Sequence, residues 1–243
     1  MIEVTALDHE YDGRRVLSEI AFSVAPGEIV AVMGSSGGGK TTLLKCISGL
    51  ITPTKGSVKV DGVDVEKDGE QARQRMGMVF QSAALFDFLT VADNILFGPR
   101  RLKRRSSTEE QSLLNDTLKA VELDPSISKQ MPSELSGGMR KRVGLARAIA
   151  SQPKVLLYDE PTTGLDPITT YAIDVLIRKM KTETGVTSLL VSHDVNSVLR
   201  TSDRVAFLDA GKMVFLGPPA DFLKADHPNI QELVRKSQAQ SLK

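Results

Sequence analysis

The sequence has little of the residues that form disulfides and metal clusters. Its 243 residues include one cysteine, Cys46, and three histidines, at positions 9, 193 and 227. A single cysteine excludes a disulfide framework and, by itself, a thiolate metal site, and it fits a reducing compartment. The histidines are too scattered to predict a metal cluster. Other residue types must therefore carry the chemistry of this chain.

Long apolar runs and an excess of one charge are also missing. No run approaches the length that crosses a bilayer. The start MIEVTALDHEYDG carries Glu and Asp and does not have the form of a signal peptide. The formal net charge is +1, so composition implies no general attraction to nucleic acid or anionic membranes. We expect a soluble, cytosolic protein of one large domain or two subdomains.

Short apolar segments predict two kinds of β structure. IEVTAL and VLSEIAFSV alternate around the turn YDGR, and GSVKVDGVDV carries an Asp-Gly turn typical of a hairpin. Five further segments are short apolar runs: IVAVM, GMVF, VLLYDE, TSLLVSHD and RVAFLDAG. Those after the first third of the chain are separated by helical patterns. Such runs are typical of strands in a parallel sheet that helices cover. The sequence thus predicts an antiparallel portion near the N-terminus and a parallel core.

Between residues 91 and 150 the patterns are helical. Thr108–Gln111 has the form of a capping box, and Leu114, Leu118 and Val121 follow on one stripe. An all-helical insert between strands of one sheet predicts a second subdomain. We expect one domain over 1–243, divided into an α/β core (1–87 and 151–217), a helical subdomain (88–150) and a C-terminal helical tail (218–243) with frayed residues 237–243.

A glycine-rich loop follows the run IVAVM. GSSGGGKTT fits the pattern G-x-x-x-x-G-K-[ST] between a strand and a helix. Its glycines let successive N–H groups surround phosphates, Lys40 reaches the β and γ oxygens, and Thr41 offers a hydroxyl to Mg²⁺. A chance lysine in a glycine-rich turn is the alternative, and the strand–loop–helix order disfavours it. The predicted ATP–Mg²⁺ site comprises Gly34, Ser35, Ser36, Gly37, Gly38, Gly39, Lys40, Thr41 and Thr42.

Two carboxylates follow a later apolar run. KVLLYDEP places Asp159 and Glu160 at the carboxyl end of a buried strand, where ligands of open α/β sheets bind. Asp159 would hold Mg²⁺ through water. Glu160, which the metal does not need, would polarise a water for attack on the γ-phosphate. Taken alone, this stretch also fits an ordinary strand end with acidic caps; together with the loop, it predicts nucleotide hydrolysis.

A second phosphate cradle is predicted in LSGGMRKRVGLARAIA, residues 135–150. Its helix opens on Ser136, Gly137 and Gly138, a start that exposes backbone N–H groups. Bare amides and the positive end of the helix dipole suit an anion. Tight packing around the two glycines is the alternative. Because the first site already has its own lysine and metal ligand, we predict that this start covers the γ-phosphate of an ATP held by another copy.

In their order, these motifs resemble those of the nucleotide-binding subunit of ABC transporters, over nearly the whole chain. The matching elements are Tyr11, the loop 34–42, Gln81, LSGGM, VLLYDEP, TGLD (163–166) and VSHD (191–194). The resemblance implies an α/β fold, a P-loop NTPase core of the ABC ATPase type with an N-terminal antiparallel β portion and an inserted helical subdomain. It also implies ATP hydrolysis in a head-to-tail homodimer coupled to an integral-membrane permease. The place implied is the cytoplasmic face of the inner (plasma) membrane, with no nucleic acid partner.

The resemblance implies roles for single residues as well. Tyr11 would stack on adenine, and Gln81 would contact Mg²⁺ and sense the membrane subunit. Ser136–Gly138 would bind the γ-phosphate of the opposite subunit. Asp166 would organise the dimer interface, and His193 would contact the γ-phosphate. Taken singly, each has an ordinary structural alternative, such as a core tyrosine or an N-capping aspartate, but their joint order favours the functional roles.

The signature carries Met139 where the family usually has Gln. This form, with MVFQSAALFDFLTVADNI (78–95) and GLDPIT (164–169), resembles the ATPases of Mla-type systems, which serve MCE-protein lipid transporters. It implies phospholipid transport and an MCE-type substrate-binding protein in the assembly. The alternatives are the ATPase of an amino-acid-type importer and a non-transport ABC ATPase. A simple P-loop kinase or GTPase would not explain LSGGM.

Two further segments concern the membrane partner. The apolar SAALFDFL after Gln81 predicts the place where a permease docks, through Leu85 and Phe86. The alternative is that both side chains belong to the core. The basic PRRLKRR, residues 99–105, favours a solvated loop. Its alternative is contact with anionic lipid headgroups or with the permease.

Overall fold

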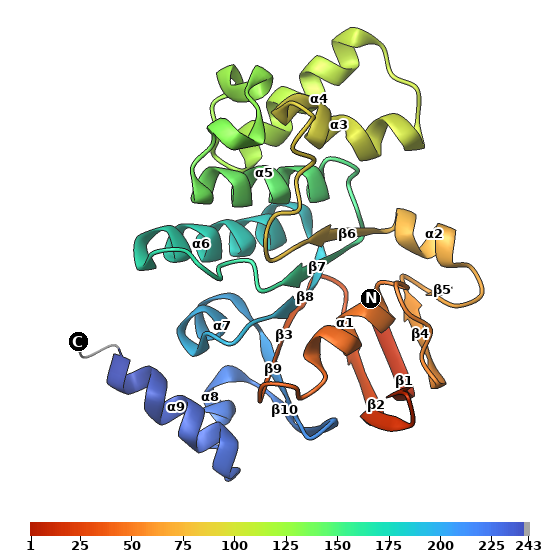
Figure 1. The fold of residues 1–243 in the computed structure, drawn as a ribbon, viewed down its shortest axis with the longest axis vertical. Coiled ribbons are helices and arrows are strands. Elements are labelled where there is room, and N and C mark those ends of the chain that lie inside the picture. Colours follow the sequence, from red (N-terminus) through yellow and green to blue (C-terminus); the bar gives the residue numbers. More distant parts are fainter. Residues whose placement is uncertain (241–243) are drawn as a thin grey trace.

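Two β-sheets form the body of the protein, shown in Figure 1 as a computed structural model that describes residues 1–240. The antiparallel sheet has the strand order β2-β1-β4-β5, and the larger sheet has the order β10-β9-β3-β8-β7-β6. The antiparallel strands are β1 (Ile2–Tyr11), β2 (Arg14–Val24), β4 (Lys55–Val60) and β5 (Val63–Asp64). The larger sheet contains β3 (Ile29–Gly34), β6 (Met76–Val79), β7 (Val155–Asp159), β8 (Thr187–Val191), β9 (Arg204–Asp209) and β10 (Lys212–Gly217).

The predicted hairpins and parallel strands are confirmed. Asp12 and Gly13 both have positive φ, 48° and 76°, as the two-residue turn between β1 and β2 requires. Strands β9, β3, β8, β7 and β6 run parallel. Strand β10 was not predicted. It follows β9 through the tight turn at Ala210 and Gly211 and pairs with it antiparallel, without the intervening helix that marked the other strands.

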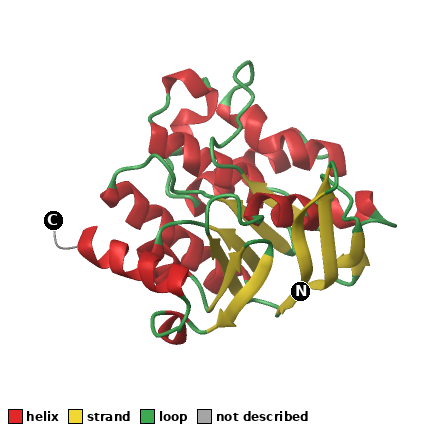
Figure 2. Ribbon diagram, turned by 60° about the horizontal axis from the view of Figure 1, so that its bottom comes forward, coloured by secondary structure: helices red, strands yellow, loops and turns green. Residues whose placement is uncertain are grey.

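Helices cover the larger sheet and form a cap at the top of Figure 1. The cap contains α3 (Val91–Leu102), α4 (Ser107–Ala120), η1 (Pro125–Lys129), η2 (Pro132–Glu134) and α5 (Gly137–Ile149). The other helices are α1 (Lys40–Ile47), α2 (Gly69–Gln74), α6 (Pro167–Thr184), α7 (Val195–Thr201), α8 (Pro219–Phe222) and α9 (Pro228–Gln240). In Figure 2 the helices lie around the two groups of strands. Within residues 1–240, no helix combines the length and the apolarity that crossing a membrane requires.

Two details of the helices correct the sequence analysis. The capping box of α4 is formed by Ser106 and Glu109, not by Thr108 and Gln111: the Glu109 N–H donates to Ser106 Oγ, and the Glu109 carboxylate accepts from the Ser106 N–H. Three consecutive hydroxyl residues, 106–108, can each cap a helix, so the pattern alone did not select the first. Residues 237–240, expected to fray, belong to α9. The rest of that predicted segment, 241–243, lies outside the described residues.

Strand β3 contributes to two hydrophobic cores because successive side chains point to opposite faces of a sheet. Ile29, Ala31 and Met33 join the core under the helical cap and α6. Val30 and Val32 join the core that α1 and the antiparallel sheet complete. Packing on both faces fixes β3 and therefore the loop that follows it.

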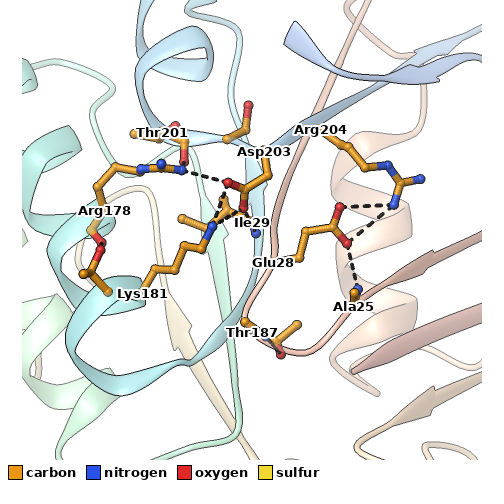
Figure 3. A network of polar contacts seen from close by, with 12 residues as sticks. Ala25, Glu28, Ile29, Arg178, Lys181, Thr187, Thr201, Asp203 and Arg204 are labelled. Carbon is orange, nitrogen blue, oxygen red and sulfur yellow. Dashed lines mark hydrogen bonds and ion pairs between the residues drawn. The ribbon is translucent and has the colours of Figure 1, made fainter.

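A network of charges holds the edge of the larger sheet where its parallel strands begin, which we call the amino edge (Figure 3). Asp203, before β9, accepts from Lys181 Nζ at 2.6 and 2.7 Å, from Arg178 at 3.0 Å and from the Ile29 N–H at 2.8 Å. Arg204 lies 3.2 Å from Glu28. Burial alone would raise the pKa of Asp203, but the bonds from Lys181, Ile29 and Arg178 outweigh it and lower the pKa. Polar groups here satisfy one another.

Candidate functional site

The opposite edge of the sheet, which we call the carboxyl edge, collects the predicted residues. Strands β3, β8, β7 and β6 are neighbours and parallel, so their carboxyl ends meet there. Gly34 ends β3, His193 follows β8, Asp159 and Glu160 stand at the end of β7, and Gln81 follows β6. The strand order thus brings together residues that are far apart in the sequence, as the topology of open α/β sheets allows.

The loop 34–39 has the form of a phosphate cradle. Its Gly39 has φ 99°, and a Cβ there would lie 2.6 Å from Leu17 Cδ2, so only glycine fits between α1 and β2. Helix α1 starts with no acidic residue in its first turn, and no side chain of the described residues caps it. Its first N–H groups are therefore available to an anion.

Lys40 lies inside this cradle. Its Nζ donates to the carbonyls of Gly34 and Ser35, both at 2.9 Å. Burial lowers the pKa of Lys40, and the charge of Glu160 opposes that effect. Phosphate oxygens make stronger, charge-assisted partners for a half-buried ammonium than neutral carbonyls do. The geometry of the loop therefore fits a polyphosphate.

The carboxylates of Asp159 and Glu160 fit a divalent cation. Burial raises the pKa of Asp159, and the negative charge of Glu160 raises it further, while Lys45 acts in the opposite direction. Among residues 1–240, no group of three or more His, Cys, Asp or Glu side chains could hold a metal by itself. Mg²⁺ does not need such a group, because it binds through one or two carboxylates, waters and substrate phosphates. Asp159, the Thr41 hydroxyl and the Gln81 amide are the oxygen donors that would hold it.

Glu160 is held in an unusual conformation. Its φ is 45°, in the left-handed region, and its N–H donates to the Val191 carbonyl at 2.9 Å. Its carboxylate accepts from Thr163 Oγ1 at 2.9 Å and lies 3.2 Å from His193 Nδ1. A non-glycine residue in this region costs about 1–3 kcal/mol, and such strain concentrates at functional sites. The structure thus pairs Glu160 with His193, and a backbone hydrogen bond to the end of β8 holds Glu160.

Ser136 and Asp166 are N-caps in the structure. Ser136 Oγ accepts from the Met139 N–H at 3.2 Å, and Asp166 accepts from the N–H groups of Ile168 and Thr169, both at 3.0 Å. The capping alternative that the sequence allowed for Asp166 is therefore a real local role, and Ser136 caps α5 in the same way. Helix α5 lies in the cap and α1 lies beside the sheets, so the two predicted cradles are separate features of one chain (Figure 1).

The two signature glycines differ in their surroundings. A Cβ on Gly138 would lie 2.8 Å from Thr169 Cγ2, so packing against α6 explains this glycine. A Cβ on Gly137 would meet, within the described part of the chain, a single atom within 4 Å, Leu165 Cδ2 at 4.0 Å. Packing within the chain therefore does not explain Gly137.

Tyr11 and Gln81 are exposed. Tyr11, at the end of β1, has 44% of its surface exposed, which rules out the core-tyrosine alternative. The ring of His9 meets it edge to face, with 4.6 Å between centroids. The backbone carbonyl of Gln81 accepts from the Lys141 ammonium.

Sequence reasoning missed three polar residues around the site. Ser35 Oγ donates to Asp209 Oδ1 at 3.0 Å, and Lys141 and Arg147 of α5 donate to the segment after β6. Asp209 follows the apolar run RVAFL, which is the same signal that indicated Asp159. Lys141 and Arg147 gave no such signal, because a basic residue on an amphipathic helix usually faces solvent.

A groove of about 710 Å³ lies between β6, α2, α3 and α5. Phe86 and Phe97 line it, with 4.9 Å between their ring centroids, and Arg147 forms part of its wall. Phe88 nearby has 78% of its surface exposed. Leu85, predicted to dock a partner, instead packs against the core under the cap.

Known proteins share this arrangement. The model of the ABC transporter family matches residues 17–163. The methionine import ATP-binding protein MetN of Caulobacter vibrioides is 43% identical over 86% of this chain, and the match spans 66% of the length of MetN. Protein TRIGALACTOSYLDIACYLGLYCEROL 3 of Arabidopsis thaliana is 38% identical over 98% of this chain and 74% of its own length.

A solved structure matches the fold over almost its whole length. The ATP-binding cassette MJ0796, in a dimeric post-hydrolysis state bound to ADP and Pi, superposes with a TM-score of 0.82. It is 31% identical and covers 90% of this chain and 99% of its own. Both the antiparallel sheet and the helical cap therefore belong to a known architecture. From its motifs, its fold and these relatives, we conclude that the chain belongs to the ABC transporter family and is an ATPase cassette that binds ATP with Mg²⁺.

Proposed function

We propose that this cassette works as a head-to-tail dimer whose ATP hydrolysis drives transport through an integral-membrane permease. One observation carries the proposal: the phosphate-binding groups of the chain are divided between two separate places. The loop 34–42 has a lysine and metal donors, whereas the start of α5 offers backbone N–H groups and an open Gly137 without a lysine. The dimeric MJ0796 cassette, bound to ADP and Pi, supports the same assembly. The dimer would lie at the cytoplasmic face of the inner membrane.

The residues divide the reaction as follows. Lys40 and the amides of the loop neutralise and orient the phosphates, while Tyr11 holds the adenine. Bound Mg²⁺ would offset the charge on the β and γ oxygens, held by Thr41, Asp159 and Gln81. Glu160 accepts the proton of the attacking water, and His193 keeps its carboxylate in position and contacts the γ-phosphate. Ser136, Gly137 and Gly138 of the second copy close the site, and Asp166 orders the interface.

Substitutions in the signature test the shared site. Ser136→Arg fills the space meant for the γ-phosphate but also removes the cap of α5. Ser136→Asp keeps a cap and places a negative charge there instead. Both should leave ATP binding to the monomer nearly intact and abolish ATP-driven dimerisation in size-exclusion chromatography. Ser133→Arg, a nearby exposed position, is the control. Weaker ATP binding by isolated Ser136→Asp monomers would show that the start of α5 serves its own chain.

Mixing two inactive variants sharpens this test. In a dimer of Ser136→Asp with Lys40→Ala, both lesions fall on one composite site, and the other site is built from two intact halves. ATPase activity of the mixture should exceed that of either variant alone. A mixture that stays as inactive as its components would contradict the head-to-tail arrangement, provided that one intact site can turn over.

The groove along α3 is where we propose that the permease docks. Phe86 and Phe97 line it, and Phe88 beside it is exposed, so an apolar helix or loop of the permease would bury them. Phe97→Glu and Phe88→Glu should reduce co-purification with the permease from membranes in mild detergent and leave ATP affinity unchanged. A charge at Leu85 tests packing instead, because that side chain belongs to the core.

For the cargo we propose a phospholipid, delivered through an MCE-type substrate-binding protein. Met139 in the signature and GLDPIT support this proposal, as does the similarity to TRIGALACTOSYLDIACYLGLYCEROL 3 over 98% of the chain. Amino-acid import is the second candidate, favoured by the 43% identity to MetN. Mass spectrometry of the purified transporter decides between them: co-purified phospholipid and lipid-stimulated ATPase activity support the first, and stimulation by methionine with its binding protein supports the second.

A further inference from the structure

The segment from Gln81 to Ala84, after β6, has a strained backbone. Ala83 and Ala84 have φ values of 62° and 46°, both in the left-handed region that glycine favours. Each such residue costs about 1–3 kcal/mol unless its surroundings hold it in place. Without contacts that hold them, two consecutive alanines would adopt an ordinary conformation with negative φ. The contacts that hold the segment must therefore be strong.

Two cations of α5 provide those contacts. Lys141, of which 8% is exposed, donates from Nζ to the Gln81 carbonyl. Arg147 donates to the Ala84 carbonyl at 2.6 Å and to the Ala83 carbonyl at 2.8 Å. The hydrogen bonds of both cations therefore go to the backbone of this segment, and Glu160 acts on Lys141 as a nearby negative charge. Hydrogen bonds from charged donors are about twice as strong as neutral ones.

Gly144 brings the helix and the segment into direct contact. A Cβ at this glycine would lie 3.0 Å from Ala83 Cβ and 3.3 Å from Ala83 Cα. Lys141, Gly144 and Arg147 recur every third residue and so face one side of α5. The helix and the segment are therefore packed directly against each other.

The same contacts connect the groove with the carboxyl edge of the sheet. Arg147 lines the groove together with Ala84 and Phe86, and its guanidinium lies 5.9 Å from the centre of the Phe86 ring. Lys141 contacts the other end of the segment, at Gln81, which follows β6 at the carboxyl edge. A partner bound in the groove would contact Arg147. A shift of Arg147 would then move the backbone of residues 81–84 and with it Gln81.

We propose that Lys141 and Arg147 are positioning residues, which hold the strained segment 81–84 so that the place of Gln81 depends on what occupies the groove. The inference rests on the proposed function, in which Gln81 contacts Mg²⁺ and a permease fills the groove. It adds the two side chains that transmit the effect. Because Ser136 is the N-cap of α5, one helix links the groove, Gln81 and the surface offered to the second copy.

A double-mutant cycle with Gln81→Ala tests the Lys141 end. Lys141→Met keeps the length and the packing and removes the charged donor. It should lower kcat about 10- to 100-fold, the loss of one charged hydrogen bond, and raise the Mg²⁺ concentration for half-maximal activity, with the Kd for ATP unchanged. In the Gln81→Ala background it should have no further effect, because the Gln81 side chain that Lys141 positions through the backbone is already absent. Lys141→Arg should restore most of the activity.

Arg142→Met is the matched control, since Arg142 of the same helix donates to the Val121 carbonyl, away from the segment. Should Lys141→Met fail to fold by circular dichroism, Lys141→Gln repeats the cycle with a neutral donor. Additive losses in the double variant, or wild-type kcat for the folded Lys141 variant, would overturn the inference. Wild-type activity and Mg²⁺ dependence of Gln81→Ala alone would instead show that the role of Gln81 in the proposed function is wrong.

Arg147 tests the groove end in the complete transporter. Arg147→Lys keeps the charge but replaces the planar guanidinium, whose two terminal nitrogens each donate to one carbonyl, with a single ammonium on a shorter side chain. It should reduce the stimulation of ATPase activity by the permease, about 10-fold or more, while the complex still co-purifies. Full stimulation in the assembled Arg147→Lys complex would contradict the proposal. Loss of co-purification would also contradict it, since Arg147 would then be part of the docking surface alone.

Discussion

The two edges of the larger sheet are built from the same strands but treat their polar groups in opposite ways. At the amino edge, Asp203 accepts four hydrogen bonds from Lys181, Arg178 and Ile29. At the carboxyl edge, Lys40 contacts neutral carbonyls, burial raises the pKa of Asp159, and Glu160 has a strained backbone. The amino edge is complete without a ligand, whereas the carboxyl edge has charges that a bound anion and cation would satisfy. Stability and function are thus assigned to opposite ends of the same strands.

Glu160→Gln gives the largest expected effect. Loss of the proposed catalytic base should reduce ATP turnover about 10²–10⁴-fold, preserve ATP binding and trap an ATP-bound dimer. Because the change removes a charge from the unsatisfied edge, the melting temperature should stay the same or rise. Steady-state ATPase assays and thermal melts of the purified protein measure both, with the exposed Glu183→Gln as control. Near-normal turnover of the variant would show that Glu160 is not the catalytic base.

Lys40→Ala should act next most strongly, on binding. The variant loses the cation that we propose contacts the phosphates, and the Kd for ATP should rise about 10- to 100-fold in titration calorimetry. The free energy of unfolding without nucleotide should change little, since the carbonyls of Gly34 and Ser35 can accept hydrogen bonds from water instead of from Lys40. An unchanged Kd would mean that the lysine is wrongly placed, and a large fall in stability would break the contrast between the edges.

Asp203→Asn tests the amino edge. It should lower the free energy of unfolding by about 1–3 kcal/mol and leave the Kd for ATP unchanged. The pKa of Asp203 is lowered in the folded protein, so its contribution is complete above the ordinary aspartate pKa of about 3.9 and is lost as the pH falls through the lower folded value. The gap between variant and wild type in urea unfolding should therefore narrow below about pH 4. A constant gap would contradict this assignment.

Met139→Gln should have the smallest effect. The proposed grip on phosphate comes from backbone N–H groups, and the Met139 side chain packs partly against the core under the cap. ATPase activity should stay within about twofold of wild type, the range typical of substitutions outside special contacts. A large gain or loss would show that the side chain itself takes part in the shared site.

The sequence predicted best what local patterns determine. Alternation and Asp-Gly turns indicated the hairpins, and the buried runs indicated β3, β7 and β8 together with the residues at their carboxyl ends. The order of strands in the sheet then brought Gln81, Glu160 and His193 to one edge, which no local pattern contains. Motif order allowed that proximity to be expected through the family resemblance.

Contacts between side chains and distant backbone could not be predicted. Lys141 and Arg147 donate to carbonyls about sixty residues away, and a carbonyl has no sequence signature. The left-handed conformations of Ala83 and Ala84 were also invisible, because only tertiary contacts can hold alanine there. The choice of Ser106 over Thr108 as the cap was decided by where the loop after α3 ends.

The central position of β3 has a consequence for how the chain folds during synthesis. The Gly27 N–H bonds to Thr187, 160 residues later, and the Ile29 N–H bonds to Asp203, 174 residues later. At about 5–20 residues per second, β3 waits on the order of ten to thirty seconds for its neighbours. Meanwhile the hairpin of β1 and β2 can already form. An apolar strand with free edges pairs readily with other chains, so the nascent protein is most vulnerable to aggregation between translation of the phosphate loop and translation of β9.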